Sequence, residues 1–352
     1  MTADQTTDCP PRRLPAEWEP QSALLLTWPR PDGDWGTRFD EIEAEFDALA
    51  DAVVAHQPLV IACADADRCA RLQRRYGRAA QIHQLPSNDV WVRDHGPIGV
   101  LGADGAVELL DFRFDGWGGK YPAADDDRLT ARLHASGALG SAPLNRLDWV
   151  LEGGSLDTDG AGTLLTTREC LLTCSRNPGA DQRWFEEQFA ALFGIRQVHW
   201  LSEGWLDGDD TDAHVDMLAR FIAPGLLVYT ACDDHNDPHY PALQAMAAEL
   251  AALRDADGNA CTCVALPWPG AHQTADGERL PISYANVTFI NDALLVPVYG
   301  IAADQAALAL YRELLPDRRV IAIPARTLIS QHGSVHCATQ HLPAPQRYNR
   351  HG

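Results

Sequence analysis

Apolar residues recur along the chain in one order, a stretch with helical spacing followed by a short β-rich run. Between residues 39 and 56 they return every three or four positions, which predicts an amphipathic helix. Residues 58–63 follow as a continuous apolar run, typical of a buried strand. The same order recurs in five further pairs: 68–76 and 81–86, 126–139 and 144–151, 182–193 and 197–201, 241–254 and 261–267, 304–315 and 319–324.

Most of these units also contain a predicted pair of strands around a turn. Such pairs are expected at 88–101, at 151–167 around Asp159-Gly160, at 215–229 around Pro224-Gly225, and at 287–298 around Asn291-Asp292. The period of about 50 to 70 residues suggests radial or solenoid stacking. No linker or low-complexity tract divides the sequence, so we expect one α/β domain over residues 1–352, with a flexible N-terminus of about 13 residues. A two-domain α/β sandwich is the alternative.

The charge balance limits the partners that the protein can have. The sequence holds 28 Lys and Arg against 49 Asp and Glu, a formal net charge of −21. Binding to nucleic acid phosphates needs basic patches, so we exclude nucleic acid as a partner. An acidic protein attracts small cations over long range. The alternative is that the charge serves only solubility or adaptation to salt.

Cysteine usage and hydropathy indicate a cytoplasmic protein. Nine cysteines are scattered without a CxxC pair, which suits free thiols in a reducing compartment better than a disulfide framework. The first 13 residues have no apolar core for a signal peptide. No apolar run approaches the roughly 20 residues that span a bilayer. We therefore expect no membrane partner.

Five polar residues, in four segments, lie at equivalent places in successive units. They are Asp94, Glu152, His214, Asp216 and Cys337. If the units closed into a ring, these positions would converge on its axis. On a strand, His214 and Asp216 would point to the same face because they are two residues apart. Each residue also has an ordinary explanation, such as a turn-capping aspartate, a surface glutamate or a small buried cysteine.

Together the five residues suit chemistry on a guanidinium group. The thiolate is the reactive form of cysteine, and a guanidinium carbon is a poor electrophile that needs such a nucleophile. Carboxylates pair with the planar cation in a bidentate geometry. Histidine can protonate a departing ammonia near neutral pH.

The chain resembles the agmatine deiminases, a branch of the guanidino-group-modifying enzymes. The resemblance extends from Pro15-Ala16-Glu17-Trp18-Glu19-Pro20 to the C-terminal motif. Its most specific blocks are Trp91-Val92-Arg93-Asp94-His95-Gly96-Pro97, Glu152-Gly153-Gly154-Ser155, His214-Val215-Asp216 and His336-Cys337-Ala338-Thr339-Gln340. Two departures concern the neighbouring positions. Residues 330–335 replace a more glycine-rich run, and Met217 stands where asparagine is common.

The resemblance implies a pseudo-fivefold α/β propeller of ββαβ units, the pentein fold, with the site on its axis and with neither metal nor organic cofactor. It implies that Cys337 is the nucleophile and His214 the acid/base. Asp94 and Asp216 would grip the guanidinium nitrogens, and Glu152 would hold both His214 and the substrate. The expected reaction of polyamine metabolism converts agmatine to N-carbamoylputrescine and ammonia through a thiouronium on Cys337.

The substrate beyond its guanidinium group is less firmly specified. Agmatine ends in an ammonium, which suits an aromatic or acidic rim. The candidates are Trp91, Trp117 and Asp210 with the acidic run 207–210 to which it belongs. Free arginine needs a cation for its carboxylate, and peptidyl arginine needs an open site. Both remain alternatives on the same catalytic core.

Other functional classes are kept open. His214-Val215-Asp216 and the donor-rich stretch 232–239 have metal-ligand spacing, which suggests a metal-dependent hydrolase as a rival. An amidinotransferase would share the core, and a non-catalytic binding propeller would share the fold. The sequence does not decide whether the protein forms a homo-oligomer.

Overall fold

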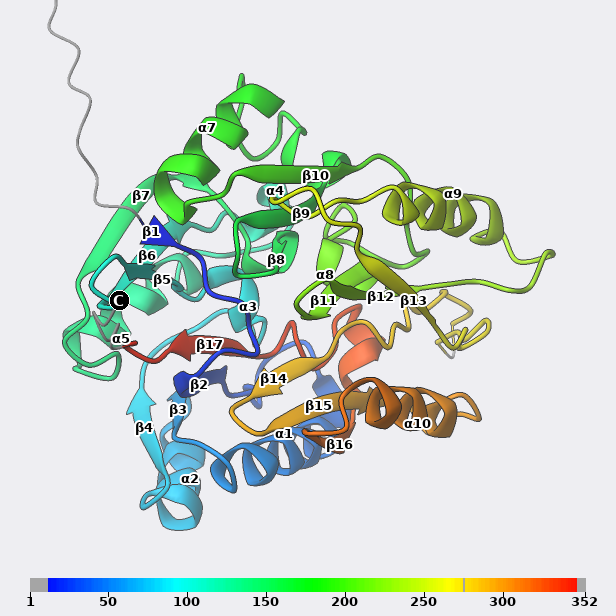
Figure 1. Ribbon diagram of the computed structural model, residues 1–352. Helices are drawn as coiled ribbons and strands as arrows, with labels where there is room; N and C mark the ends of the chain where they lie inside the picture. The colour runs from blue at the N-terminus through cyan, green and yellow to red at the C-terminus, as the bar shows by residue number, and fades with distance from the viewer. Residues whose placement is uncertain (1–11, 275, 347–352) are drawn as a thin grey trace, which may run out of the picture.

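Five sheets form the framework of the described residues, 12–274 and 276–346 of the computed structural model (Figure 1). In spatial order they are β17 (Gln340–Pro343), β2 (Gln21–Thr27), β3 (Leu59–Cys63) and β4 (Ala80–Gln84); β1 (Arg12–Arg13), β5 (Ile98–Gly102), β6 (Val107–Arg113) and β7 (Leu144–Val150); β8 (Asp157–Thr158), β9 (Thr163–Thr167) and β10 (Gln197–Leu201); β11 (Ala219–Ala223), β12 (Leu226–Thr230) and β13 (Thr262–Leu266); β14 (Thr288–Ile290), β15 (Ala293–Val298) and β16 (Arg319–Pro324).

Each sheet repeats one pairing scheme, an antiparallel pair followed by a parallel strand. In the fourth sheet, for example, β11 pairs antiparallel with β12, and β12 pairs parallel with β13. A parallel neighbour requires a crossover connection, and a helix supplies it. These helices are α1 (Phe39–Val54), α5 (Leu129–Ala135), α7 (Gln182–Phe193), α9 (Tyr240–Ala251) and α10 (Asp304–Leu314), with α2 (Ala66–Tyr76) leading to the additional strand β4. The chain is thus a series of ββαβ units.

The helices lie on the outside of the molecule, and the sheets lie between them and its middle (Figure 1). Their apolar faces pack against the sheets. In α1, for instance, Ile42, Phe46 and Leu49 have no exposed surface. Two other buried clusters fill the space under α7 and under α5. Within the described residues, no helix combines the length and apolar character needed to cross a bilayer.

The sheet that contains β2 joins the two ends of the described chain. Its outer strand β17 pairs antiparallel with β2, with Gln340 opposite Leu25 and Leu342 opposite Ala23. Nearby, Arg13 donates to Glu19 at 2.6 Å and to Gln346 at 2.9 Å. Residues close to both ends therefore stabilise each other.

The long elements confirm the sequence predictions, whereas the starts of three predicted hairpins do not. Residues 88–101 hold the helical turn α3 (Val92–His95) and only one strand, and the hairpin is made by β5 and β6 instead. The segment from 151 begins with the 3-10 turn η3 (Gly153–Ser155), and that from 215 with α8 (Val215–Leu218). Most of the predicted flexible N-terminus lies outside the described residues; Arg12 and Arg13 pair with β5.

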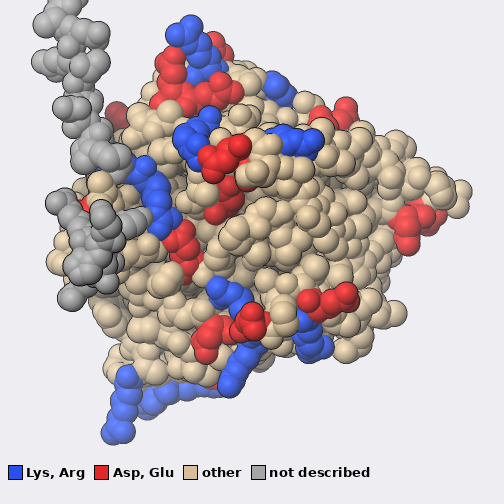
Figure 2. Space-filling model, viewed as in Figure 1, with Lys and Arg blue, Asp and Glu red and all other residues tan. Residues whose placement is uncertain are grey.

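Charged residues of both signs are mixed on the face shown in Figure 2. Oppositely charged side chains also form pairs in the described structure; Arg71 and Arg75, for example, both contact Asp47 at 2.9 Å. The excess negative charge is therefore not gathered into one acidic field on this face.

Candidate active site

Asp94 lies at the end of the helical turn α3 and is 4% exposed. Its Oδ2 accepts a hydrogen bond from Trp117 Nε1 at 2.9 Å, and its Oδ1 accepts one from the Gly154 amide at 2.9 Å. Burial raises the pKa of Asp94 to about 6, and Glu152 and Asp216 add to the shift while His214 opposes it. The carboxylate is thus oriented by two donors but remains without a full counter-charge.

Of the two glycines in the block Glu152-Gly153-Gly154-Ser155, Gly154 is the one that lies against the charged groups of the site. A Cβ on this residue would lie 2.6 Å from His214 Nδ1 and 2.8 Å from Asp94 Oδ1. No side chain fits between these two groups without displacing one of them. The glycine therefore lets η3 approach the charged centre closely.

His214 precedes α8, where its imidazole lies between two carboxylates. Its Nε2 lies 2.9 Å from Glu152 Oε2, and its Nδ1 lies 3.7 Å from Asp94 Oδ1. Burial acts to lower the pKa of His214, but Asp94, Cys170 and Glu152 together raise it well above its usual value. His214 is therefore an imidazolium at neutral pH, able to donate a proton.

Glu152 is fixed behind His214 by a buried arginine. Arg176 Nε donates to both oxygens of Glu152, at 2.8 and 2.9 Å, and its Nη1 and Nη2 donate to Asp212 and to the Thr211 carbonyl. Although burial acts to raise it, the hydrogen bonds and charges of His214 and Arg176 lower the pKa of Glu152. Glu152 is thus an ionised partner of His214.

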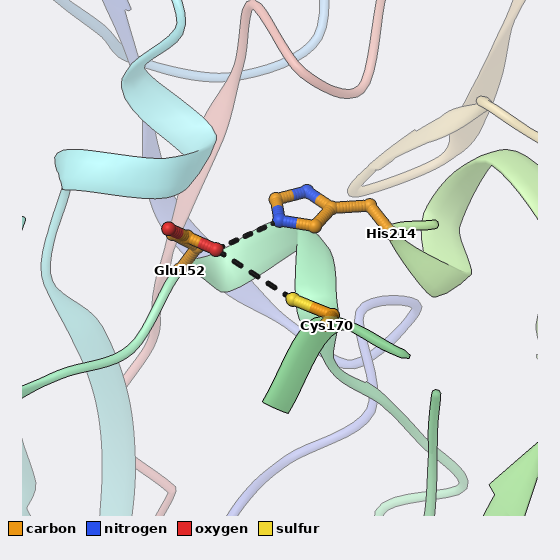
Figure 3. Close-up of side chains that lie close together, drawn as sticks. All are labelled: Glu152, Cys170 and His214. Carbon is orange, nitrogen blue, oxygen red and sulfur yellow. Dashed lines mark hydrogen bonds and ion pairs between the residues drawn. The ribbon is translucent and has the colours of Figure 1, made fainter. Parts of the chain in front are cut away.

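Cys170 completes this cluster, which has the composition of a metal site. Ligand atoms of Glu152, Cys170 and His214 lie within 4.8 Å of one another, and Figure 3 shows Glu152 interacting with both of the other side chains. The Cys170 thiol donates to Glu152 Oε2 at 3.7 Å, and its pKa is raised by burial. A metal would have to displace the protons of the imidazolium and the thiol beside Arg176, so the cluster fits a hydrogen-bonded network better than a metal centre.

The donor-rich stretch 232–239 is likewise occupied by local hydrogen bonds. Asp237 Oδ1 lies 2.6 Å from His239 Nδ1, and His239 Nε2 accepts from the Asp207 amide at 2.7 Å. Arg279 also donates to Asp237 at 2.8 Å. Because both imidazole nitrogens of His239 have hydrogen-bond partners, this stretch does not support the alternative of a metal-dependent hydrolase.

Cys337 contacts Asp216 and Asn286. Its Sγ is 3.2 Å from Asn286 Nδ2 and 3.6 Å from Asp216 Oδ2. Burial, followed by the charges of Asp216 and Asp94, raises the pKa of Cys337 well above its usual value. Without an added positive charge nearby, the sulfur is a neutral thiol.

Asp216 lies in the helical turn α8, not on a strand as the spacing suggested. Its Oδ2 accepts from His336 Nδ1 at 2.7 Å and from Asn286 Nδ2 at 3.1 Å. Within the described part of the chain, its buried Oδ1 has no hydrogen-bond partner. One oxygen is therefore held in place while the other is available to a ligand.

These groups face a cavity of about 200 Å³. Asp94, His214, Asp216 and Cys337 line it, and so do the predicted rim residues Trp91, Trp117 and Asp210. Glu152 does not line it, which differs from the expectation that it also holds the substrate. Asp209, from the same predicted acidic run as Asp210, also lines the cavity, and so do two aspartates that were not among the predicted site residues, Asp34 and Asp89.

Backbone strain is concentrated around the same cavity. The non-glycine residues with positive φ in the described chain are Trp117, Asp212, Ala213 and His332. Trp117 and His332 line the cavity, and the other two precede His214. Strained backbone of this kind clusters at functional sites.

The sequence analysis missed Asn286 because it lies in no block that stood out from its surroundings. Asp89 belongs to the segment before Trp91, and burial raises its pKa to about 6, with Asp34 and Asp210 adding to the shift. The position of Asp89 directly before the Trp91 motif was the sequence signal that could have identified it. Asn286 had no comparable sequence signal.

Comparison with known proteins also indicates a deiminase. Residues 13–343 match the family model of the Porphyromonas-type peptidyl-arginine deiminases. The agmatine deiminase of Stutzerimonas stutzeri is 34% identical over 94% of this chain and 95% of its own length. A C. jejuni agmatine deiminase solved with substrate bound is 30% identical, with a TM-score of 0.89 over 98% of this chain and all of that one. Pseudomonas aeruginosa DDAH, at 12% identity and a TM-score of 0.51, covers 92% of this chain and shares the fold.

Proposed function

Because the chain belongs to the Porphyromonas-type peptidyl-arginine deiminase family, we propose that it is an agmatine deiminase, hydrolysing agmatine to N-carbamoylputrescine and ammonia. The observation that carries this proposal is the pair Asp94 and Asp216 beside the Cys337 thiol. Both carboxylates border the cavity, and Asp216 Oδ1 has no partner in the described residues. A planar cation would satisfy them.

The five ββαβ units are, in this proposal, the blades of one closed pseudo-fivefold propeller, a single domain with the cavity at its axis. The recurrence of the pairing scheme in all five sheets supports it. So does the pairing of β17 with β2, which joins the end of the series to its beginning.

Binding of the guanidinium group prepares the nucleophile. The cation enters between Asp94 and Asp216 and compensates the negative charge that keeps the Cys337 pKa high. The thiol then loses its proton to solvent and attacks the guanidinium carbon. The imidazolium of His214 gives its Nδ1 proton to one nitrogen, which leaves as ammonia when its bond to carbon breaks.

The second half of the reaction restores the enzyme. His214, now neutral, takes a proton from a water molecule, and the water oxygen bonds to the carbon of the thiouronium. The carbon–sulfur bond then breaks, the hydroxyl proton of the intermediate passes to the departing sulfur, and N-carbamoylputrescine is released with its new carbonyl group, which leaves Cys337 as a thiol again. Glu152 keeps the imidazole oriented in both steps through its contact with Nε2. These roles need no metal or organic cofactor.

The cavity lining supports agmatine over free arginine. It contains Asp34, Asp89 and Asp210 beyond the catalytic groups, together with Trp91 and Trp117. Among the described residues that line it there is no arginine or lysine to pair with an α-carboxylate. Lys120, which is nearby, is bound to the Asp210 carbonyl and to Asp212 Oδ1, both at 2.7 Å. A second cationic end therefore fits this mouth better than a zwitterion.

The test is ammonia release from agmatine, free arginine and a blocked arginyl peptide under identical conditions. We expect the highest kcat/KM on agmatine. Equal or higher kcat/KM on either other substrate would reject agmatine while keeping deimination. Transfer to an added acceptor amine would indicate an amidinotransferase.

A further inference from the structure

Glu17 is a buried carboxylate outside the proposed catalytic set. It lies between β1 and β2, and its side chain is 8% exposed. Its Oε2 lies 2.7 Å from His336 Nε2, 3.0 Å from Arg220 Nη2 and 3.5 Å from Arg93 Nη2. Its Oε1 accepts from the Phe289 amide at 2.8 Å. One side chain from the N-terminal segment thus connects α3, β11, β14 and the cysteine motif.

His336 lies between Glu17 and Asp216. Its Nδ1 is 2.7 Å from Asp216 Oδ2, and its Nε2 is 2.7 Å from Glu17 Oε2. Carboxylate oxygens only accept hydrogen bonds when ionised, and a neutral imidazole donates from one nitrogen only. Two contacts this short therefore require two protons within the three groups, one more than a neutral histidine brings.

We propose that Glu17 is a positioning residue for the deimination reaction: through its proton-sharing contact with His336 it keeps Asp216 ionised, with Oδ2 held and Oδ1 free for the guanidinium group. This role rests on the proposed function. Glu17 itself does not line the cavity that contains Cys337, so it acts on Asp216 only through His336.

The surroundings of His336 show why Glu17 is needed for this arrangement. Burial lowers the pKa of His336, and the nearby guanidinium groups of Arg220 and Arg93 lower it further, whereas Glu17 and Asp216 oppose them. His341 also faces Glu17, at 4.0 Å. If the negative charge of Glu17 is removed, Asp216 remains as the carboxylate that opposes the two arginines, and His336 loses its second proton. Asp216 then loses the positive charge of His336, its hydrogen-bond partner.

Glu17→Gln tests the proposal, with Asp157→Asn as the matched control. Asp157 is also a buried carboxylate bound to Arg220, and it accepts from the Phe221 amide at 3.2 Å. Both variants leave Arg220 with one carboxylate, so both should lower the unfolding temperature. Only Glu17 contacts His336 among the carboxylates of these two variants. The two substitutions therefore separate loss of stability from loss of positioning.

The kinetic readout is the pH profile of kcat/KM on agmatine. Asp94, with a pKa of about 6, sets the acidic limb of the wild type. Loss of a neighbouring positive charge raises a carboxylate pKa by about 1 to 3 units, so in Glu17→Gln the pKa of Asp216 should rise toward that of Asp94 and make the acidic limb steeper. The acidic limb of Asp157→Asn should stay where the wild-type limb lies. An unchanged acidic limb in Glu17→Gln, or the same change in both variants, would overturn the proposal.

A second readout does not depend on turnover. Nitrogen-15 NMR near pH 7, with the His336 signals assigned by their loss in His336→Gln, should find a proton on both ring nitrogens in the wild type and on one in Glu17→Gln. A wild-type His336 with one bare nitrogen would refute the Glu17 contact as we interpret it. If the wild type releases no ammonia from agmatine, the proposed function fails, while the NMR result still decides whether Glu17 controls His336.

Discussion

Replacement of Arg176 by methionine should destabilise the protein strongly. The Arg176 side chain is 1% exposed, and its guanidinium group satisfies Glu152, Asp212 and the Thr211 carbonyl. Methionine fills similar space but leaves Glu152, which is fully buried, with His214 as its remaining strong partner. Breaking a buried ion pair by removing one partner costs about 3–5 kcal/mol. We expect a loss of that size in the free energy of unfolding.

Lys120→Met is the matched control for this prediction. Lys120 also contacts Asp212, at 2.7 Å, but its side chain is 39% exposed. Exposed ion pairs contribute about 0–1 kcal/mol, so this variant should unfold close to the wild type. Urea unfolding followed by tryptophan fluorescence and by circular dichroism measures both variants, provided that the two signals change together and the slopes agree.

The activity of Arg176→Met gives an independent check. Glu152 orients His214, so the kcat of the folded variant should fall, while Lys120→Met should retain it. A loss of less than about 1 kcal/mol for Arg176→Met, similar to the control, would mean that solvent or another group replaces the guanidinium. The buried ion pair between Arg176 and Glu152 would then contribute less to the free energy of unfolding than we expect.

Three other predictions concern the cavity. Cys337→Ala should abolish ammonia release but still bind agmatine, and measurable turnover in this variant would exclude Cys337 as the nucleophile. Asp94→Asn and Asp216→Asn should each lower kcat/KM by orders of magnitude, and the double variant should lose less than the sum because both act on one bound group. Agmatine should bind Cys337→Ala more weakly as the pH falls below about 6, because Asp94 must lose its proton to pair with the cation. The Kd should rise by up to about tenfold per pH unit. Calorimetry that finds a constant Kd between pH 5 and 7 would contradict this prediction.

Long elements with strong periodicity could be predicted closely from the sequence. The predicted ranges 182–193, 197–201 and 319–324 are those of α7, β10 and β16. Each has an apolar face that packs within its own unit, so local pattern is sufficient. β2 was not predicted, and its partner β17 lies more than 300 residues away, a contact that no local window contains.

The site could be predicted in composition but not in geometry. The motif residues Asp94, His214, Asp216 and Cys337 do line one cavity. Their supports α3, η3 and α8 are turns of three or four residues, too short to show a helical period. Arg176 acts entirely through contacts with other parts of the chain, so its type and spacing carried no signal.

The pairing of β17 with β2 has a consequence for protein synthesis. Strand β17, which completes the sheet of β2, leaves the ribosome about 300 residues after β2, and the cysteine motif directly precedes β17. At about 5–20 residues per second, the intervening 300 or so residues take roughly 15–60 s to be made. Throughout that time the edge of β2 is an open template for wrong pairing, which makes β2 the part of the nascent chain where chaperone protection should matter most. Activity should accordingly appear only after β17 has emerged, in one step, because the nucleophile and the strand that anchors it arrive together.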